Sequence, residues 1–197
     1  MRKIIVLNGV HGAGKTTLAM QLAQEFPNIY VFYPEIGKQL RDQVSYNSLE
    51  SGEVFDLEVM RMEMERDKQL MREDRIPLVE TWHIGNLGYM AARSPQLVEA
   101  YERNLNETLQ TITPLAIYLD ISWETFRERI SEHIHSDQVD TLIRFYQTIA
   151  NKTFELYRHY GIRYYVVSGE QSIRENVVQI VKELRGEIKP MARKEQY

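Results

Sequence analysis

A glycine-rich segment directly after an apolar run constrains this chain more than any other feature of its sequence. Residues 4–7 read Ile-Ile-Val-Leu, and residues 9–16 read Gly-Val-His-Gly-Ala-Gly-Lys-Thr. The second segment fits the phosphate-binding pattern G-x-x-x-x-G-K-[ST], in which glycines let successive backbone N–H groups point at phosphate oxygens. Leu18, Leu22 and Phe26 then follow at four-residue spacing, which is typical of a helix. The sequence therefore predicts a strand, an anion-binding loop and a helix in succession.

The loop residues have distinct expected roles. Lys15 would reach the β- and γ-phosphates of a nucleotide, and the Thr16 hydroxyl would ligate Mg²⁺. The start of the following helix adds N–H groups and the positive end of its dipole. A glycine turn that merely fits the pattern is the alternative, and the flanking strand and helix argue against it. The residues expected to bind the nucleotide are Gly9, His11, Gly12, Ala13, Gly14, Lys15, Thr16 and Thr17.

The composition excludes several classes of protein. The chain has 197 residues, of which 43% are hydrophobic and 26% charged, as expected for one soluble domain. It contains no cysteine, which excludes disulfides, zinc–thiolate sites and thiol catalysis. A net charge of −4 gives no support to a general nucleic-acid binder. No apolar run approaches the roughly 20 residues of a membrane span, and no signal-peptide pattern follows Met1, so a cytoplasmic location is expected.

Strand and helix patterns alternate along the chain. The predicted strands are residues 3–7, 29–33, 76–80, 115–120 and 163–167. The predicted helices cover 15–26, 53–73 and 142–150, or begin at Ser94-Pro95, at Ser122 and at the capping box Ser172–Glu175. The polar stretch 38–52 has no clear period. Alternation of this kind predicts a parallel, doubly wound sheet in one domain, residues 1–186, followed by a polar tail, 187–197.

Acidic residues stand where predicted strands end, and ligands of such sheets bind beyond the carboxyl ends of the strands. Glu80 could hold Mg²⁺ directly or through a water, and the alternative is an acid that caps the next turn. Glu35 is a candidate general base or ligand of the acceptor hydroxyl, and the alternative is an ordinary loop acid. Asp120 is better explained as the start of the next helix, beside Ser122.

Arginines and flat side chains are candidates for the acceptor side of the site. Arg61 is preferred because the predicted helix 53–73 follows the polar segment over the cleft, although most helical arginines are solvated surface residues. Arg93 is a further candidate, while Arg127 and Arg129 precede an interrupted stretch that would form a lid. Trp82 and His83, directly after Glu80 and Thr81, could stack on a nucleobase.

Methionines in the helix 53–73 allow two interpretations. Met60, Met62 and Met64 could line the site of a flat base, but such side chains more often belong to the core. The helical pattern places Leu57, Met60, Met64 and Met71 near one stripe. His133 and His135 lack a third ligand at a recognisable spacing, so no metal site is expected there.

The chain resembles the thymidylate kinase and deoxynucleoside kinase family along nearly its whole length. The segments that carry the resemblance, besides the glycine-rich loop, are 31–37, 78–82, 115–121, 126–130 and 167–173. The resemblance implies a three-layer P-loop NTPase fold, with a five-stranded parallel sheet in the order 2-3-1-4-5, flanked by helices. It also implies an acceptor-binding region over about 34–75, a short helical lid over about 127–140, and ATP with Mg²⁺ as cofactors. The catalytic residues would be Lys15, Glu35, Glu80, Arg127 and Arg129.

Two positions and one stretch depart from the family's pattern. Thr81 stands where the family has an arginine after the strand-three acid, and His11 stands where thymidylate kinases often carry an acid. The stretch 133–137 contains none of the arginines usual in the lid. Either Arg93, Arg127 or Arg129 compensates, or the acceptor differs from the usual one.

The leading hypothesis is ATP-dependent phosphoryl transfer to a nucleoside or nucleoside monophosphate, with no polymeric nucleic acid or membrane partner. A homodimer is compatible with the sequence. One alternative is a P-loop kinase of another small-molecule hydroxyl, motivated by the missing arginine at Thr81. The other is a nucleotide-binding regulatory ATPase, which would bind nucleotide tightly and hydrolyse it slowly without a small acceptor.

Overall fold

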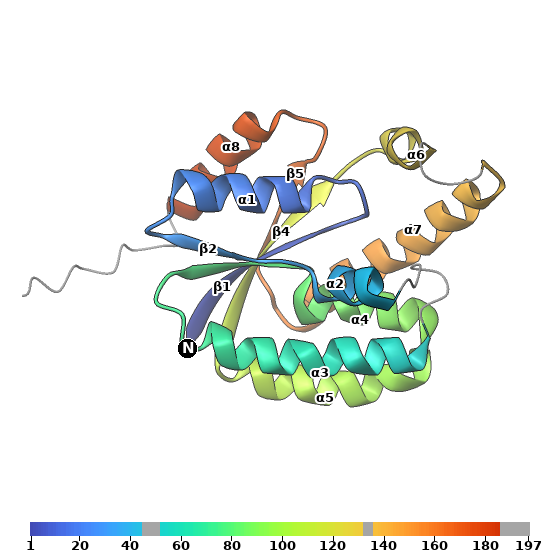
Figure 1. Ribbon diagram of the computed structural model, residues 1–197, viewed down its shortest axis with the longest axis horizontal. Helices are drawn as coiled ribbons and strands as arrows, with labels where there is room; N and C mark the ends of the chain where they lie inside the picture. Colours follow the sequence, from blue (N-terminus) through green and yellow to red (C-terminus); the bar gives the residue numbers. More distant parts are fainter. Residues whose placement is uncertain (45–51, 132–135, 186–197) are drawn as a thin grey trace, which may run out of the picture.

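Five parallel strands form the centre of the computed structural model, which describes residues 1–44, 52–131 and 136–185 (Figure 1). The strands are β1 (Arg2–Gly9), β2 (Tyr30–Tyr33), β3 (Ile76–Glu80), β4 (Ile112–Asp120) and β5 (Tyr164–Ser168). Their order in the sheet is β2-β3-β1-β4-β5, with every neighbouring pair parallel. This confirms the predicted fold class and strand order.

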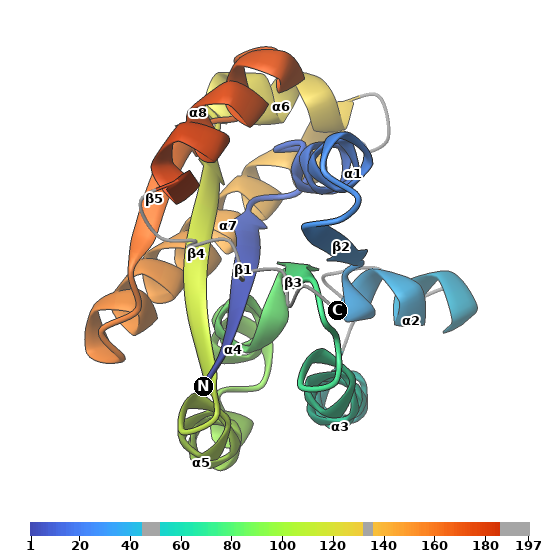
Figure 2. The ribbon, with the colours of Figure 1, turned by 90° about the vertical axis from the view of Figure 1, so that its left-hand side faces the viewer.

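Helices cover both faces of the sheet and complete the three layers (Figures 1 and 2). One face carries α1 (Lys15–Glu25) and α8 (Ile173–Arg185). The opposite face carries α3 (Glu53–Leu70), α4 (Trp82–Arg93), α5 (Val98–Leu109) and α7 (Ser136–His159). Two shorter helices, α2 (Ile36–Val44) and α6 (Trp123–Ser131), lie beyond the edge where β1 runs into the glycine-rich loop. A 3₁₀ turn, Pro95–Leu97, precedes α5.

The apolar run that opens the chain is buried on both faces because β1 is the central strand. Ile4, Ile5, Val6 and Leu7 are at most 2% exposed. Ile5 and Leu7 pack with residues of α1 and α8, whereas Ile4 and Val6 pack with residues of α4 and α5. This alternation follows from the two-residue period of a strand, and it explains why the run contains no polar residue.

Local helix signals in the sequence are confirmed where a serine begins a helix. The Ser122 hydroxyl accepts the N–H of Thr125 at 3.1 Å. In the capping box, the N–H of Glu175 donates to the Ser172 hydroxyl at 3.3 Å, and the N–H of Ser172 donates to the Glu175 carboxylate at 2.9 Å.

Two helices were not predicted, and one was predicted with the wrong buried face. Helix α2 begins within the turn after Glu35, and α4 begins directly after Thr81. Most of the stripe expected for this helix is wrong: Leu57, Met64 and Met71 are 39–47% exposed, whereas Met60 packs against the core. The face of α3 that is buried instead carries Phe55, Asp56, Val59, Glu63, Arg66, Asp67 and Leu70. Polar residues can occupy this face because they pair with one another and with α4.

Some predictions concern parts of the chain that the structure does not describe. The expected lid, 127–140, is described only in part, and His133, His135 and the tail 187–197 lie outside the described residues. Among the helices of the described ranges, none combines the length and the apolar character needed to cross a bilayer.

Candidate active site

The glycine-rich loop between β1 and α1 has the backbone shape that an anion site requires. Gly9, Gly12 and Gly14 have φ angles of 141°, 74° and 95°, a region that favours glycine. A Cβ atom at Gly9 would lie 2.4 Å from the Leu119 carbonyl oxygen of β4, so no side chain fits there. The Lys15 ammonium donates to the carbonyls of Gly9 and Val10, each at 3.1 Å. The lysine is thereby held over the loop in which phosphate oxygens would lie.

Thr16 and Glu80 meet at the carboxyl ends of β1 and β3. The Thr16 hydroxyl lies 2.9 and 3.0 Å from the two carboxylate oxygens of Glu80, which is 4% exposed. Burial raises the pKa of Glu80 above its usual value; Lys15 opposes this effect and Glu35 adds to it. A hydroxyl and a carboxylate side by side, with the carboxylate short of compensating positive charge, fit a Mg²⁺ ion.

The turn that follows Glu80 has an unusual backbone. Thr81 and Trp82 have φ angles of 71° and 39°, and these are the positive-φ residues other than glycine among the described residues. The Thr81 N–H donates to the Leu7 carbonyl at 3.0 Å, which ties the turn to β1. A β-branched residue in this region is strained, and such strain persists only where surrounding contacts hold it. Glu80 is therefore held at the sheet edge by a fixed turn.

Glu35 lies in the same cleft and is paired with Arg41, a residue that the sequence analysis missed. The Arg41 guanidinium donates to the Glu35 carboxylate at 3.0 Å, and the two side chains are 17% and 10% exposed. Burial favours the neutral acid, but Lys15 and then Arg41 outweigh it and hold the pKa of Glu35 below its usual value. Arg41 belongs to α2, in the stretch 38–52 for which no helix was predicted.

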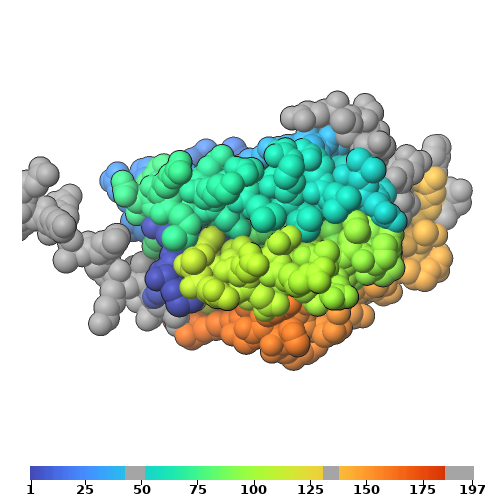
Figure 3. Space-filling view, turned by 90° about the horizontal axis from the view of Figure 1, so that it is seen from below, coloured from blue at the N-terminus to red at the C-terminus, as the bar shows by residue number. Residues whose placement is uncertain are grey.

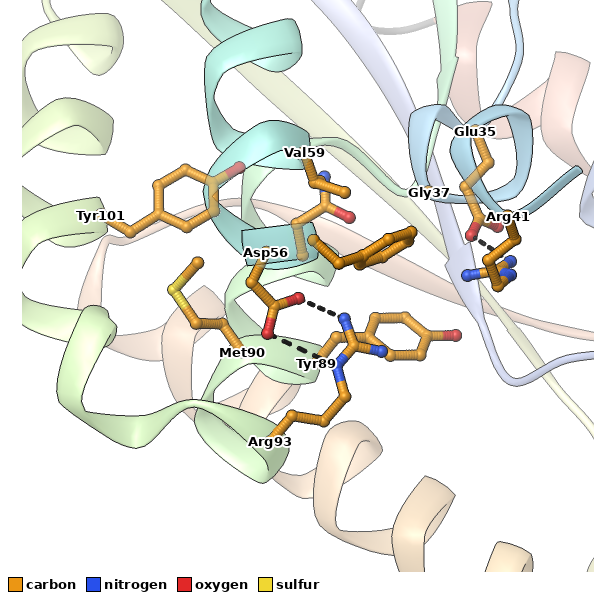
Figure 4. A pocket seen from close by; sticks show the side chains of 11 residues that line it. Glu35, Gly37, Arg41, Asp56, Val59, Tyr89, Met90, Arg93 and Tyr101 are labelled. Atoms are coloured by element: carbon orange, nitrogen blue, oxygen red, sulfur yellow. Dashed lines mark hydrogen bonds and ion pairs between the residues drawn. The ribbon is translucent and has the colours of Figure 1, made fainter. Parts of the chain in front are cut away.

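An aromatic and charged pocket opens beside the Glu35–Arg41 pair (Figure 4). Arg93 of α4 forms a buried ion pair with Asp56 of α3, and the Ser94 hydroxyl donates to the same carboxylate at 2.8 Å. The Arg93 guanidinium lies 5.5 Å from the ring centre of Phe55 and 5.2 Å from that of Tyr89. The remaining lining includes Gly37, Val59, Asn86, Met90 and Tyr101. The pocket thus has flat apolar surfaces with one charged edge.

Arg129 of α6 lies at the glycine-rich loop, as expected of a residue that acts on phosphates. Its guanidinium donates to the Gly12 carbonyl at 2.7 Å and to the Gly169 carbonyl, after β5, at 3.1 Å. Arg127 instead pairs with Asp140 of α7 at 2.5 Å, and both side chains are more than half exposed. The structure therefore brings Arg129, but not Arg127, to the loop.

The prediction that Trp82 and His83 stack on a nucleobase is wrong. Both residues are 0% exposed. The Trp82 indole N–H donates to Asp67 at 3.0 Å, and the His83 ring bridges Asp67 at 2.7 Å and the Tyr101 hydroxyl at 2.9 Å. Protein atoms surround both rings on every side, so no ligand can reach them.

Arg61, the arginine preferred for the acceptor, is outside this cleft. It pairs with Glu58 at 2.6 Å on the outer surface of α3, where its side chain is 62% exposed. It lines a separate groove between α2 and α3, together with Tyr33, Gln39 and Met62. Arg93, the other acceptor-side arginine that was predicted, does line the pocket beside Glu35.

His11 is exposed at the rim of the loop, and its surroundings keep the ring uncharged. Desolvation by the neighbouring protein and then the charge of Lys15 lower the pKa of His11. Glu35 opposes this effect, and Arg41 and Lys38 add smaller contributions that lower the pKa. A neutral imidazole at this position adds no charge to the anion site near pH 7. The remaining loop residues lie as expected, with Ala13 buried and Thr17 exposed on α1.

Solved structures, among them a deoxyadenosine kinase, share this fold. The deoxyadenosine kinase from M. mycoides with bound dATP is 18% identical, with a TM-score of 0.63 over 93% of this chain and 99% of that chain. The same enzyme with the products dCMP and a flexible dCDP bound is 16% identical, with a TM-score of 0.62 over the same shares. The YorR protein from Bacillus subtilis in complex with phosphorylated GDP is 18% identical, with a TM-score of 0.58 over 95% and 99%.

Comparison of the sequence with profiles of protein families assigns the chain to a family. A comparison with curated protein sequences found no significant match. The profile of the thymidylate kinase family matches residues 7–180, which include the glycine-rich loop, Glu35, Glu80 and the pocket beside them. The chain belongs to the thymidylate kinase family and is a nucleoside or nucleotide kinase.

Proposed function

We propose that this kinase transfers the γ-phosphoryl group of ATP, bound with Mg²⁺, to a hydroxyl group of a nucleoside. The observation that carries the proposal is Glu35, a buried carboxylate between Lys15 and Arg41 at the mouth of an aromatic pocket. A nucleoside offers a flat base for such a pocket and a hydroxyl for such a carboxylate. Of the described residues that line this pocket, Asp56 is the second carboxylate, and its oxygens already accept hydrogen bonds from Arg93 and Ser94.

The donor phosphates would bind along the glycine-rich loop. Lys15 would contact the β- and γ-phosphates, and Arg129 would approach them from the Gly12 side. Thr16 and Glu80 would hold Mg²⁺, which neutralises charge on the phosphate oxygens when bound. Among the described residues there is no cluster of three or more acidic or histidine side chains suited to a metal. This agrees with Mg²⁺, which usually takes one or two protein ligands and completes its shell with water and phosphate.

Glu35 would orient the acceptor hydroxyl by accepting its hydrogen bond. Its lowered pKa keeps the carboxylate ionised near neutral pH, so it can accept but is a weak base. A weak base suffices because phosphoryl transfer has a loose transition state, in which positioning and charge stabilisation matter most.

Recognition of the base is proposed for the aromatic part of the pocket. Phe55 and Tyr89 offer ring faces for stacking, and the Arg93–Asp56 pair offers a polar edge. The cavity between these side chains has a volume of about 10 Å³, room for about one water molecule. We infer that Arg41 or Arg93 swings aside when the acceptor enters.

A nucleoside monophosphate is the second candidate acceptor, and Arg41 is the observation that favours it. A guanidinium in the cleft can bind a phosphate through two parallel hydrogen bonds. Arg41 would then exchange its bond with Glu35 for one with the acceptor phosphate.

Turnover of a panel of nucleosides and nucleoside monophosphates with MgATP tests the proposal, with ADP release as the measurement. With a nucleoside acceptor, Glu35→Gln should lower kcat by about a hundredfold, as expected for loss of the carboxylate that orients the acceptor hydroxyl. With a monophosphate acceptor, Arg41→Gln should instead raise KM for that acceptor by about tenfold or more, through loss of a charge-assisted contact.

Lys15→Ala serves as the inactive reference, since it removes the cation from the phosphate loop. No ADP release dependent on any acceptor of the panel would contradict the proposal. Turnover of non-nucleoside hydroxyls alone would contradict the assigned acceptor class.

We also propose that the protein forms a homodimer in the cytoplasm. Exposed apolar side chains recur along the outer side of α3, which lies on the surface beside α5 (Figure 3). They are Val54, Leu57 and Met64 of α3 and Met71 directly after it, exposed by 82, 41, 39 and 47%. Light scattering after gel filtration measures the mass, and a monomer at all concentrations would contradict the dimer. Cell fractionation tests the location.

A further inference from the structure

The buried face of α3 carries charged residues that the proposed reaction does not use. Glu63, Arg66 and Asp67 are 0, 5 and 8% exposed. Charged groups at such depth are costly unless paired, so an apolar face would be the ordinary solution for a helix packed on α4. Glu63 and Arg66 pair with each other, and further partners of the three residues lie in the turn after β2 and in α4.

Arg66 connects α3 to the turn that carries Glu35. One nitrogen of its guanidinium donates to the Pro34 carbonyl at 2.8 Å, and another donates to Glu63 at 2.6 Å. Glu63 in turn accepts the side-chain amide of Asn86, on α4, at 2.6 Å. The peptide whose carbonyl is bound by Arg66 directly precedes Glu35. Rotation of that peptide would displace the Glu35 side chain from Lys15 and Arg41.

Asp67, the next residue, connects α3 to the turn that carries Glu80. Its two carboxylate oxygens contact the Trp82 indole N–H at 3.0 Å and the His83 ring at 2.7 Å. Trp82 is one of the two residues in the strained turn after Glu80. The same segment of α3 therefore contacts the residue before Glu35 and the turn after Glu80.

We propose that Arg66 is a positioning residue, which places Glu35 relative to Glu80 and the phosphate loop by holding the Pro34 carbonyl. This inference rests on the proposed function, since it assigns Arg66 its effect through Glu35. Asp67 fixes the position of α3 relative to Glu80, because it is hydrogen-bonded to Trp82 and His83, in and directly after the turn that follows Glu80. A shift of Glu35 by about 1 Å would be enough to matter, since misplacement of that size can cost about a hundredfold in rate.

A purely structural role for the Glu63–Arg66 pair is the competing explanation. Removal of one partner would leave a buried charge and destabilise the fold, which would tell nothing about Glu35. Replacement of both partners avoids this problem. In Glu63→Gln/Arg66→Met, the glutamine can still accept from Asn86, and methionine fills the volume without a charge or a donor for Pro34.

The experiment compares this double variant with the wild type on the best acceptor of the panel. We expect kcat to fall about ten- to a hundredfold, while the Kd of MgATP stays within about twofold because the loop is untouched. The matched control is Glu65→Gln/Lys68→Met, which removes an exposed pair at the same spacing on the same helix. Its kcat should equal that of the wild type. An unchanged kcat in the buried variant would overturn the proposal, as would equal losses of kcat and of MgATP binding.

A cycle with Glu35→Gln distinguishes positioning from structure. If Arg66 acts through Glu35, the Glu63→Gln/Arg66→Met change should cost no more than about twofold once Glu35 is already replaced. Additive losses would overturn the proposal. Should the double variant fail to fold, Arg66→Lys replaces it. The lysine ammonium can pair with Glu63, but unlike the planar guanidinium it cannot donate to the Pro34 carbonyl at the same time.

Titration of the Glu35 carboxyl by ¹³C NMR gives a result that does not depend on turnover. In the wild type, Lys15 and Arg41 hold the pKa of Glu35 below its usual value. In Glu63→Gln/Arg66→Met the pKa should return toward that value, and an unchanged pKa would overturn the proposal. Inactivity of the wild type on the whole panel, with the expected change in this titration, would contradict the proposed function and leave the positioning role supported.

Discussion

Glu35 and Glu80 show how neighbouring carboxylates of one cleft acquire opposite properties. Burial disfavours the charged form of both carboxylates, and Lys15 favours it in both. Glu35 also has Arg41 as a direct ion-pair partner, whereas the direct partner of Glu80 is the neutral Thr16 hydroxyl. The pKa of Glu35 is therefore lowered and that of Glu80 raised. Divergent pKa values in one cleft often separate two roles. Here Glu35 would accept the hydrogen bond of the substrate hydroxyl, and Glu80 would be a metal ligand.

The acidic limb of the pH–rate profile should come from Glu80 and not from Glu35. As the pH falls, protonation of Glu80 begins above the usual pKa of a glutamate and weakens Mg²⁺ binding, whereas Glu35 stays ionised to below that value. We expect kcat/KM to fall on the acidic side in the wild type and also in Glu35→Gln, where the limb moves to lower pH because Glu35 no longer raises the pKa of Glu80. Initial rates from pH 4.5 to 8 at subsaturating Mg²⁺ provide the measurement. Loss of the limb in Glu35→Gln would assign it to Glu35 instead.

Glu80→Gln should raise thermal stability while it abolishes most activity. Because the folded protein raises the pKa of Glu80, the ionised carboxylate opposes folding at every pH above that pKa, and a neutral amide removes this effect. The loss of a metal ligand should lower kcat by about a hundredfold or more. Differential scanning calorimetry without nucleotide, together with the ADP assay, measures both. Glu107→Gln, at an exposed site of α5, should change neither; a lower Tm for Glu80→Gln would refute the argument.

At the scale of elements, α4 packs along α7 through a glycine. A Cβ atom at Gly88 would lie 2.9 Å from the Thr153 hydroxyl and 3.1 Å from the Ile149 carbonyl. Both distances are shorter than ordinary contacts, and Thr153 is 2% exposed and hydrogen-bonded to the same carbonyl. Close approach of the two helices therefore requires the absence of a side chain at position 88.

Gly88→Val should destabilise the protein by about 2 kcal/mol or more, since overpacked cores typically lose about 1–3 kcal/mol. Urea unfolding monitored by circular dichroism gives the free energy of unfolding. Gly52→Val is the control, because a Cβ atom there meets nothing within 4 Å. Equal effects of the two substitutions would mean that the loss comes from glycine's backbone freedom and not from packing.

The elements that the sequence predicted correctly are those with a local signal. The phosphate loop, the strand ends at Glu80 and Asp120, and the caps at Ser122 and Ser172 depend on residues close in sequence. The strand order came from the family resemblance. Helix α2 was missed although Ile36, Leu40 and Val44 recur at four-residue spacing, because the polar stretch was taken to begin at residue 38, which leaves out Ile36. Arg41 was missed with it.

The remaining errors arose from contacts distant in sequence. Trp82 and His83 were given a ligand-binding role because they follow Glu80, whereas their partner is Asp67, on another helix. The methionine stripe of α3 was chosen because apolar residues usually face the core. Here the buried face is polar, since Glu63 and Arg66 pair with each other and with neighbouring elements. No periodicity within α3 could reveal such partners.

At the scale of the whole molecule, nucleotide binding should stabilise the fold by mass action. MgATP at a hundred times its Kd contributes about 2.7 kcal/mol. For a domain of this size that corresponds to a rise in Tm of about 5–10 °C. Thermal shift with MgATP measures it, and Lys15→Ala, which lacks the loop cation, should show a much smaller shift at the same concentration. An equal shift in this variant would mean that ATP binds elsewhere.

The strand order has a consequence for how the chain can fold during synthesis on the ribosome. β2 is made second but pairs only with β3, which separates it from β1 in the finished sheet. Until residues 76–80 have left the exit tunnel, neither β1 nor β2 has any partner strand among the residues already translated. The phosphate loop and the Glu35 turn are thus synthesised early but can acquire their fixed positions only once β3 is inserted between the two strands. Pauses in translation before residue 80 would prolong the exposure of two apolar strands, and this is the interval in which chaperones would be expected to act on the nascent chain.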